Sequence, residues 1–336
     1  MTQSRTKTMN NRIHLTIALG MGLAIGTNGQ DGQLSQFDAA NMLLNPALTG
    51  MFDQGDFRMT SNVRSQWNSL SSSFLTTSFG YDIAMQERYG FGTYLTNYNM
   101  AGIMNTFQAG GSAAYNVLDK NAKAKLSAGV NLGLIYKKIN DQQLVWDAQY
   151  NDGYFDTDLP SGEFIEKAGR LMPDVSVGIA YQSTNINKRV NPFGNFALFH
   201  VTTPDESILR TTKSDIPIRW SVNGGARIEV TPDIFLIPMG LYWRQGADQL
   251  IHAGMMGEIA IPGSVYSGVA GVSYRLNDAI VAQLGLKHKN AMYRFSYDVN
   301  ISPLGKYTNK NGAYEFSVIY YGTHSGHDRR VQRKSF

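Results

Sequence analysis

The sequence predicts an all-β protein: a transmembrane antiparallel β-barrel of about 14 strands, with short periplasmic turns and longer extracellular loops. Three observations lead to this prediction. Apolar residues make up 43% of the chain and charged residues only 17%, and 34 Gly and 18 Tyr suit many short strands with tight turns. Beyond Gln30 no window is apolar enough for a transmembrane helix, so a membrane protein would have to be a closed barrel. Many segments also alternate apolar and polar residues, as barrel strands do.

The amino-terminal residues 1–29 predict a signal peptide that is cleaved after export. Three basic residues precede an uncharged, mostly apolar stretch at 13–25, and small residues follow up to Gly29. The apolar stretch is shorter than the ~20 residues of a membrane-spanning helix, which disfavours a permanent anchor. Cleavage is expected near Gln30 or directly after Gly26. The predicted organisation is a signal peptide at 1–29, a barrel at 30–322 with a lead segment at 30–55, and a basic polar tail at 323–336.

Charge and cysteine content exclude several classes of function. Removal of the signal peptide leaves 27 basic and 26 acidic residues. The mature chain therefore lacks the excess of positive charge that is typical of nucleic-acid-binding proteins. The chain has no cysteine, which excludes disulfide frameworks, thiolate metal sites and cysteine nucleophiles. The classes that remain are membrane barrels and exported soluble β-proteins.

Alternation of side chains is clearest in three stretches. From Leu126 to Tyr136 an apolar residue stands at every second position, with small or polar residues between except for Ile135. The stretches 266–276 and 291–299 repeat this pattern, and their charged residues fall on the face that would point into a lumen. A soluble sandwich would show the same alternation with the opposite burial, so that rival stays open at this point.

Clusters of Gly, Pro, Asn and Asp divide the chain into strands. The resulting number is even, as in single-chain bacterial barrels whose two termini are periplasmic. The predicted strands are 56–64, 74–82, 89–98, 105–117, 124–140, 174–182, 196–202, 218–230, 234–245, 248–259, 265–276, 278–287, 291–299 and 313–321.

The lengths of the connections agree with this topology. If the mature chain begins on the periplasmic side, the periplasmic connections include the short ones at 118–123, 231–233, 260–264 and 288–290. The longest, 141–173, falls outside, where it is expected to tolerate insertion near Gly153. The external connections also include 202–217 and 300–312. One periplasmic connection, 183–195, is longer than this rule expects.

Three short motifs follow one another at the start of the mature chain. They are Ser35-Gln36-Phe37, Leu44-Asn45-Pro46-Ala47 and Arg64-Ser65-Gln66-Trp67. Further motifs are Pro173-Asp174, Leu198-Phe199-His200 and Phe295-Ser296-Tyr297-Asp298-Val299-Asn300. In order and spacing the series closely resembles the PorP/SprF family, membrane proteins of the type IX secretion and gliding machinery of Bacteroidetes. One departure is the tail, which in many members is basic and contains a cysteine but here has only Arg329, Arg330, Arg333 and Lys334.

The resemblance implies a non-enzymatic outer-membrane component of type IX secretion. It would bind or anchor specific secreted cargo at the cell surface, with cargo, other components of the machinery and the lipid bilayer as partners. Two other functions stay open: a transport barrel for hydrophobic or small solutes, and a soluble exported β-protein or adhesin.

The candidate partner or family residues are those of the first three motifs. They allow a docking surface, or a lead segment tucked into the lumen where Arg64 meets an acidic group. They also allow a purely structural role, in which Pro46 fixes a turn and Trp67 lies in the interfacial aromatic belt. For Trp67 the belt is favoured, and for the others both explanations stay open. The residues are Ser35, Gln36, Phe37, Asn45, Pro46, Ala47, Arg64, Gln66 and Trp67.

Motifs for catalysis and metal binding are absent from the sequence. It contains no nucleophile elbow, phosphate-binding loop, dinucleotide fingerprint or zinc-protease helix. The acidic residues of 141–173 lack the spacing of an EF-hand, and His324 and His327 belong to the polar tail, which favours solvated segments over Ca²⁺ or zinc sites. We therefore expect no enzyme activity, cofactor, metal site or small-molecule substrate.

Overall fold

The computed structural model describes residues 31–68, 73–86, 88–119, 121–140, 147–151, 154–156, 159–160, 169–207 and 213–323. The expected signal peptide, Gly153, His324 and His327 lie outside these residues. No helix among them is long and apolar enough to cross a membrane.

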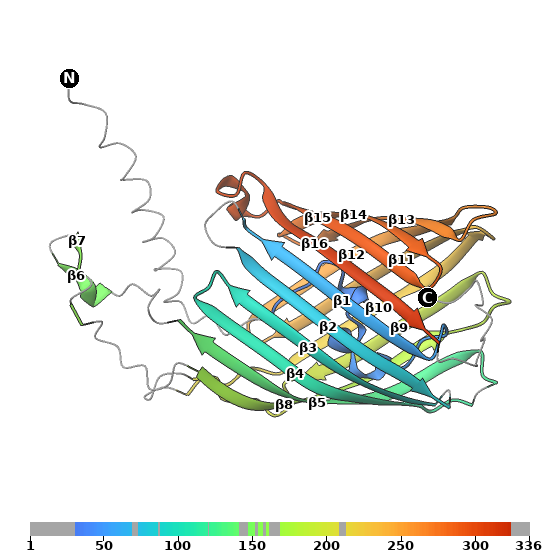
Figure 1. Cartoon of the computed structure of the whole chain (residues 1–336), viewed down its shortest axis with the longest axis horizontal. Coiled ribbons are helices and arrows are strands. Elements are labelled where there is room, and N and C mark those ends of the chain that lie inside the picture. Colours follow the sequence, from blue (N-terminus) through green and yellow to red (C-terminus); the bar gives the residue numbers. More distant parts are fainter. Residues whose placement is uncertain are drawn as a thin grey trace, which may run out of the picture. The chain divides into compact units, whose positions relative to one another are not determined.

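The described chain forms a closed antiparallel barrel of fourteen strands, which confirms the predicted number (Figure 1). The first strand pairs with the last along its whole length, so neither has a free edge. The barrel strands are β1 (Phe57–Gln66), β2 (Phe74–Met85), β3 (Tyr89–Met100), β4 (Met104–Asn116), β5 (Ala124–Ile139), β8 (Gly169–Ser183), β9 (Val190–Phe199), β10 (Arg219–Thr231), β11 (Ile234–Gln245), β12 (Asp248–Ala260), β13 (Tyr266–Arg275), β14 (Ala279–His288), β15 (Ala291–Asn300) and β16 (Asn311–Gly322).

The alternation predicted from sequence sorts side chains between two faces. On β5, Leu132 is 61% exposed on the outer face, whereas its neighbour Asn131 is buried in the lumen. The same contrast separates Phe316 from Glu315 on β16. An apolar outside and a polar, charged inside are the reverse of a soluble sandwich, and they suit a barrel whose solvent is lipid.

Aromatic rings on the outer face meet in pairs near both ends of the strands. Trp220 contacts Tyr242 and Tyr297 contacts Tyr314 near one end. Tyr89 contacts Tyr115 near the other. Rings at both ends of an apolar band form the two interfacial girdles that outer-membrane barrels show.

The two ends of the barrel differ in their connections. At one end, which we call the inner end, the connections are short and comprise residues 86–88, 117–123, 184–189, 232–233, 261–265 and 289–290. At the other, the outer end, they include the long segments 140–168, 200–218 and 301–310. The first of these carries a small hairpin, β6 (Tyr150–Asn151) and β7 (Tyr154–Phe155). Short periplasmic turns and long external loops are typical of outer-membrane barrels.

The largest differences from the predicted strand boundaries are at the starts of two strands. β8 begins at Gly169 rather than at 174, and β9 begins at Val190 rather than at 196. Backbone pairing to β5 and to β10 carries both strands past the point where the apolar alternation ends. The inner connection 184–189 is therefore short, and the one exception to the predicted topology disappears.

The lead segment lies inside the barrel, where Figure 1 shows it as the blue chain between the walls. It consists of short turns of helix, which are η1 (Phe37–Ala39), α2 (Asn41–Leu44) and η2 (Pro46–Leu48). η1 contacts β1 and β16, and η2 contacts β4, β5 and β8. The described part of the lead segment thus contacts two separate parts of the barrel wall.

Candidate functional site

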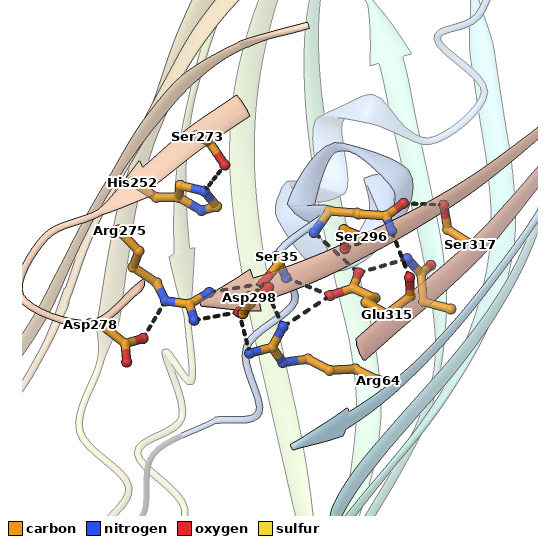
Figure 2. A network of polar contacts seen from close by, with 12 residues as sticks. Ser35, Arg64, His252, Ser273, Arg275, Asp278, Ser296, Asp298, Glu315 and Ser317 are labelled. Carbon is orange, nitrogen blue, oxygen red and sulfur yellow. Dashed lines mark hydrogen bonds and ion pairs between the residues drawn. The ribbon is translucent and has the colours of Figure 1, made fainter. Parts of the chain in front are cut away.

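A cluster of charged residues binds the first turn of the lead segment to the barrel wall (Figure 2). We call Ser35, Arg64, Arg275, Asp298 and Glu315 the luminal ion cluster. Arg64 places Nη2 2.9 Å from Oδ2 of Asp298 and Nη1 3.4 Å from Oε2 of Glu315. Arg275 places Nη2 2.7 Å from the same Asp298 oxygen. The hydroxyl of Ser35 lies among these groups and accepts from both guanidinium groups.

Strand alternation and barrel closure together assemble this cluster. The inward face of each strand carries one member, and Arg64 on β1 lies directly opposite Glu315 on β16 in the strand register. Asp298 follows on the adjacent β15, and Arg275 reaches the same carboxylate from β13. Because β1 and β16 meet only when the sheet closes, the Arg64–Glu315 contact exists only in the closed barrel.

The luminal ion cluster is almost entirely shielded from solvent. Arg64 is 2% exposed, Glu315 is 1% exposed and Asp298 is fully covered. Two guanidinium groups face the two buried carboxylates, and Arg275 also pairs with the partly exposed Asp278. A buried charge without a partner would be costly, and each group here has an opposite charge and hydrogen bonds instead.

Gln36 and the backbone beside it hold the same wall through neutral groups. The backbone N–H groups of Ser35 and Gln36 donate to Glu315 at 2.7 and 3.1 Å. The Gln36 amide donates to the hydroxyl of Ser296 at 3.0 Å and accepts from Ser317 at 2.5 Å. Every polar atom of the Gln36 side chain is thereby satisfied in a site from which water is excluded.

The next two residues of the lead segment bind different parts of the barrel wall. Phe37 packs with Leu241, Trp243 and Leu250 in a buried apolar cluster on β11 and β12. Its ring also contacts His252 edge to face, with 5.1 Å between ring centres. Asp38 accepts from Arg294 on β15 at 2.7 Å.

Asn45 forms a second, separate attachment near the middle of the lumen. Its amide nitrogen donates to the carbonyl oxygens of Ile179 and Phe196 at 3.1 and 3.0 Å, and its oxygen accepts from the N–H of Ala47 at 2.8 Å. A Cβ on Gly178 would overlap this amide, so glycine leaves the space that Asn45 fills. Pro46 lies against Gly129 on β5 in the same way.

The lead segment ends with a third attachment at the inner end of the lumen. Asp82 on β2 accepts from the N–H of Gly50 at 2.6 Å and pairs with Arg58 on β1 at 2.7 Å. Arg58 also donates to the carbonyl oxygen of Leu48 at 2.9 Å. Lys125 pairs with Asp53 at 2.5 Å, so the segment is anchored just before β1 begins.

The structure unites some of the sequence-derived candidates and separates others. Ser35 and Gln36 join Arg64 in and around the luminal ion cluster, and Phe37 packs beside it. Asn45, Pro46 and Ala47 belong to the second attachment. Gln66 and Trp67 belong to neither, because they lie at the outer end of β1, where Trp67 bonds Gly312 through its backbone and packs edge to face on Phe74 at 4.8 Å. Whether any of these residues docks a partner stays a prediction.

The sequence predicts on which face of a strand several further side chains lie, but not which residues they contact. Arg275 and Asp298 were expected to point inward, and they do. No local sequence pattern predicts their contacts with Ser35. Arg58 and Asp82 were not singled out, although both alternate with apolar neighbours on their strands.

The described histidines inside the barrel have protein partners and do not form a metal-ligand cluster. No group of three or more His, Asp or Glu side chains in this part of the chain is placed to hold a metal ion. His252 bonds the hydroxyl of Ser273 at 2.8 Å, and His200 bonds Asp174 at 3.0 Å. Both imidazoles therefore have a protein partner within the barrel.

Comparisons with known proteins give one family and a shared fold. Residues 26–320 match the model of a family described as type IX secretion system membrane protein PorP/SprF. No curated protein matches the chain. Among solved structures, the toluene transporter TbuX of Ralstonia pickettii is similar with a TM-score of 0.51 and 12% identity, over 85% of this chain and 94% of that one. A mutant of the monoaromatic hydrocarbon channel TodX also gives a TM-score of 0.51, with 9% identity over 85% and 94% of the two chains. At such identities the likeness extends to the barrel fold alone.

Proposed function

The chain belongs to the PorP/SprF family of type IX secretion system membrane proteins, and from this premise we propose that it binds or anchors specific secreted cargo at the cell surface without enzymatic turnover. Family membership and the fourteen-stranded barrel place it in the outer membrane as a part of the secretion machinery. Its partners in the proposal are cargo proteins and other components of that machinery.

The observation that carries the proposal is the anchored lead segment inside the lumen. Three sets of buried contacts hold it, at Ser35, Asn45 and Gly50. A lumen filled by the protein's own chain suits a rigid scaffold better than a path for bulk solutes. The buried carboxylates of Asp298 and Glu315 are bound to guanidinium groups, which favours a structural role for them over acid–base catalysis.

A transport barrel is the second candidate, and two observations favour it. The barrel shares its fold with structures named as a toluene transporter and a monoaromatic hydrocarbon channel. Part of the lumen is also apolar, where Phe37 meets Leu241, Trp243 and Leu250. A hydrophobic solute would need such a surface along its path.

A deletion strain separates the two candidates. We expect it to lose particular proteins from the cell surface, with these proteins released into the medium or retained in the cell, and to take up toluene at the wild-type rate. Complementation with the wild-type chain should restore the surface proteins. Normal surface proteins together with slowed toluene uptake would reject the cargo proposal and support transport.

A further inference from the structure

The lead segment runs through the lumen in one direction, and its contacts mark each step. Its first described residues lie at the outer end of the barrel. Gly32 contacts the ring of Tyr98, two residues before β3 ends at its outer boundary, Met100. Ser35 bonds Asp298, which lies two residues before the outer boundary of β15, Asn300.

The later residues of the segment lie progressively further inward. Asn45 bonds Ile179 and Phe196 well inside the strands. Gly50 lies against Gly90, the second residue of β3 at the inner end. Gly55 contacts Gly322, the last residue of β16. The segment therefore crosses the lumen from its outer end to its inner end before β1 starts.

The predicted topology starts from a mature chain that begins on the periplasmic side. β1 begins at the inner end, whose short connections are typical of the periplasmic side. Gly32 lies at the opposite, outer end of the barrel. Fixed attachments at the outer end, the middle and the inner end leave the segment one way to lie.

We propose that the amino-terminal end of the mature chain is displayed at the outer mouth of the barrel, open to a protein outside the cell. If cleavage falls near Gln30, the new terminus lies within a few residues of Gly32. The display follows from the path of the lead segment alone, whereas the identity of its partner as secreted cargo rests on the proposed function.

The absence of cysteine from the chain allows a direct test. Three single-cysteine variants would be treated on intact cells with a maleimide that does not cross the outer membrane. Gln33→Cys probes the lead segment, Ala247→Cys the exposed outer turn between β11 and β12, and Ser264→Cys the exposed inner turn between β12 and β13. We expect Gln33→Cys to label like Ala247→Cys, and Ser264→Cys to label only after permeabilisation.

Two results would contradict the proposed position of the amino-terminal end at the outer mouth. One is labelling of Gln33→Cys only after permeabilisation, and the other is labelling only after denaturation. Asp31→Cys provides a second labelling position, also half-buried, in case the substitution at residue 33 alters its own surroundings. Heat-modifiable mobility on gels verifies that each variant has assembled.

Contact with secreted cargo is tested separately from the path of the lead segment through the lumen. A bulky polyethylene-glycol maleimide attached to Gln33→Cys should reduce the cargo retained at the surface, and the same reagent on Ala247→Cys should not. Unchanged retention would reject contact with cargo at this end of the chain. The deletion strain tests the proposed function independently. A failure of the proposed function can therefore be distinguished from a failure of cargo contact at the amino-terminal end.

Discussion

The hydroxyl of Ser35 on the lead segment bonds the carboxylate of Asp298 on β15, whose two oxygens lie 2.9 and 2.8 Å away. The same hydroxyl accepts from Arg64 at 2.5 Å and from Arg275 at 3.0 Å. One small side chain thus links the start of the lead segment to three strands of the wall.

Ser35→Ala should destabilise the barrel by about 1–3 kcal/mol, because it leaves buried charged groups short of one hydrogen bond each. The measurement is the urea midpoint of unfolding in detergent or lipid. Ser65→Ala is the matched control, since the hydroxyl of Ser65 bonds Asn68 at an exposed position. Equal midpoints for the two variants would contradict the role given to Ser35.

Arg64→Met should cost more, about 3–5 kcal/mol, because it removes one of two guanidinium groups from a buried pair of carboxylates. The double variant Arg64→Met with Glu315→Gln should regain part of that loss, since it removes the unpaired charge as well. A double-mutant cycle of unfolding free energies measures the coupling. Additive effects would show that Arg64 and Glu315 do not act on each other.

Gly178→Ala should displace Asn45 from its position on the wall and destabilise the barrel by about 1–3 kcal/mol through overpacking. Gly268→Ala is the control, because a Cβ on Gly268 would meet no atom within 4 Å. Protease cleavage within the lead segment of the folded barrel should become faster in the first variant only. Equal cleavage in both variants would mean that Asn45 does not anchor the segment.

The connection between β9 and β10 should open at acidic pH. Asp205 accepts from the backbone N–H groups of Ser207 and Ser214 at 3.0 and 3.2 Å and pairs with Arg170 at 2.8 Å. These contacts, with the Ser207 N–H first, lower the pKa of Asp205 below its ordinary value. Because the folded pKa is the lower one, the stabilisation is present above about pH 3.9 and is lost as the pH falls through the folded pKa.

Hydrogen exchange across 200–218 measures this opening, with protection corrected for intrinsic rates. We expect wild-type protection to fall as the pH drops below about 4. Asp205→Asn should show the lower protection already at neutral pH and no further loss in that range. Wild-type protection that is constant down to pH 3 would contradict the assignment.

Phe316→Asp should lower the amount of assembled barrel, because it puts a charge on the lipid face of the closing strand β16. The cost is about 2–4 kcal/mol for a basic residue at mid-membrane and smaller for Asp. Deleting 331–336 should leave assembly unchanged, since the described sheet closes at Gly322. Heat-modifiable mobility in outer-membrane fractions gives the readout, and the opposite pattern would mean that the tail directs assembly.

The sequence by itself determined the strands and their faces. Alternation with a period of two is local, so it shows which side chains share a face without knowledge of the partner strand. Clusters of Gly, Pro, Asn and Asp predicted the number of strands, and alternation predicted the inward direction of Arg275 and Asp298. These patterns missed the starts of β8 and β9, because backbone pairing there continues beyond the apolar pattern.

Only the tertiary structure decided which inward residues meet and where the lead segment goes. Arg64 and Glu315 are 251 positions apart and become neighbours when the barrel closes. Further along the wall, Gly178 and Gly129 leave the room that Asn45 and Pro46 of the lead segment occupy. Such contacts depend on closure and on the shape of the lumen, which are properties of all fourteen strands together. No local period in the sequence encodes them.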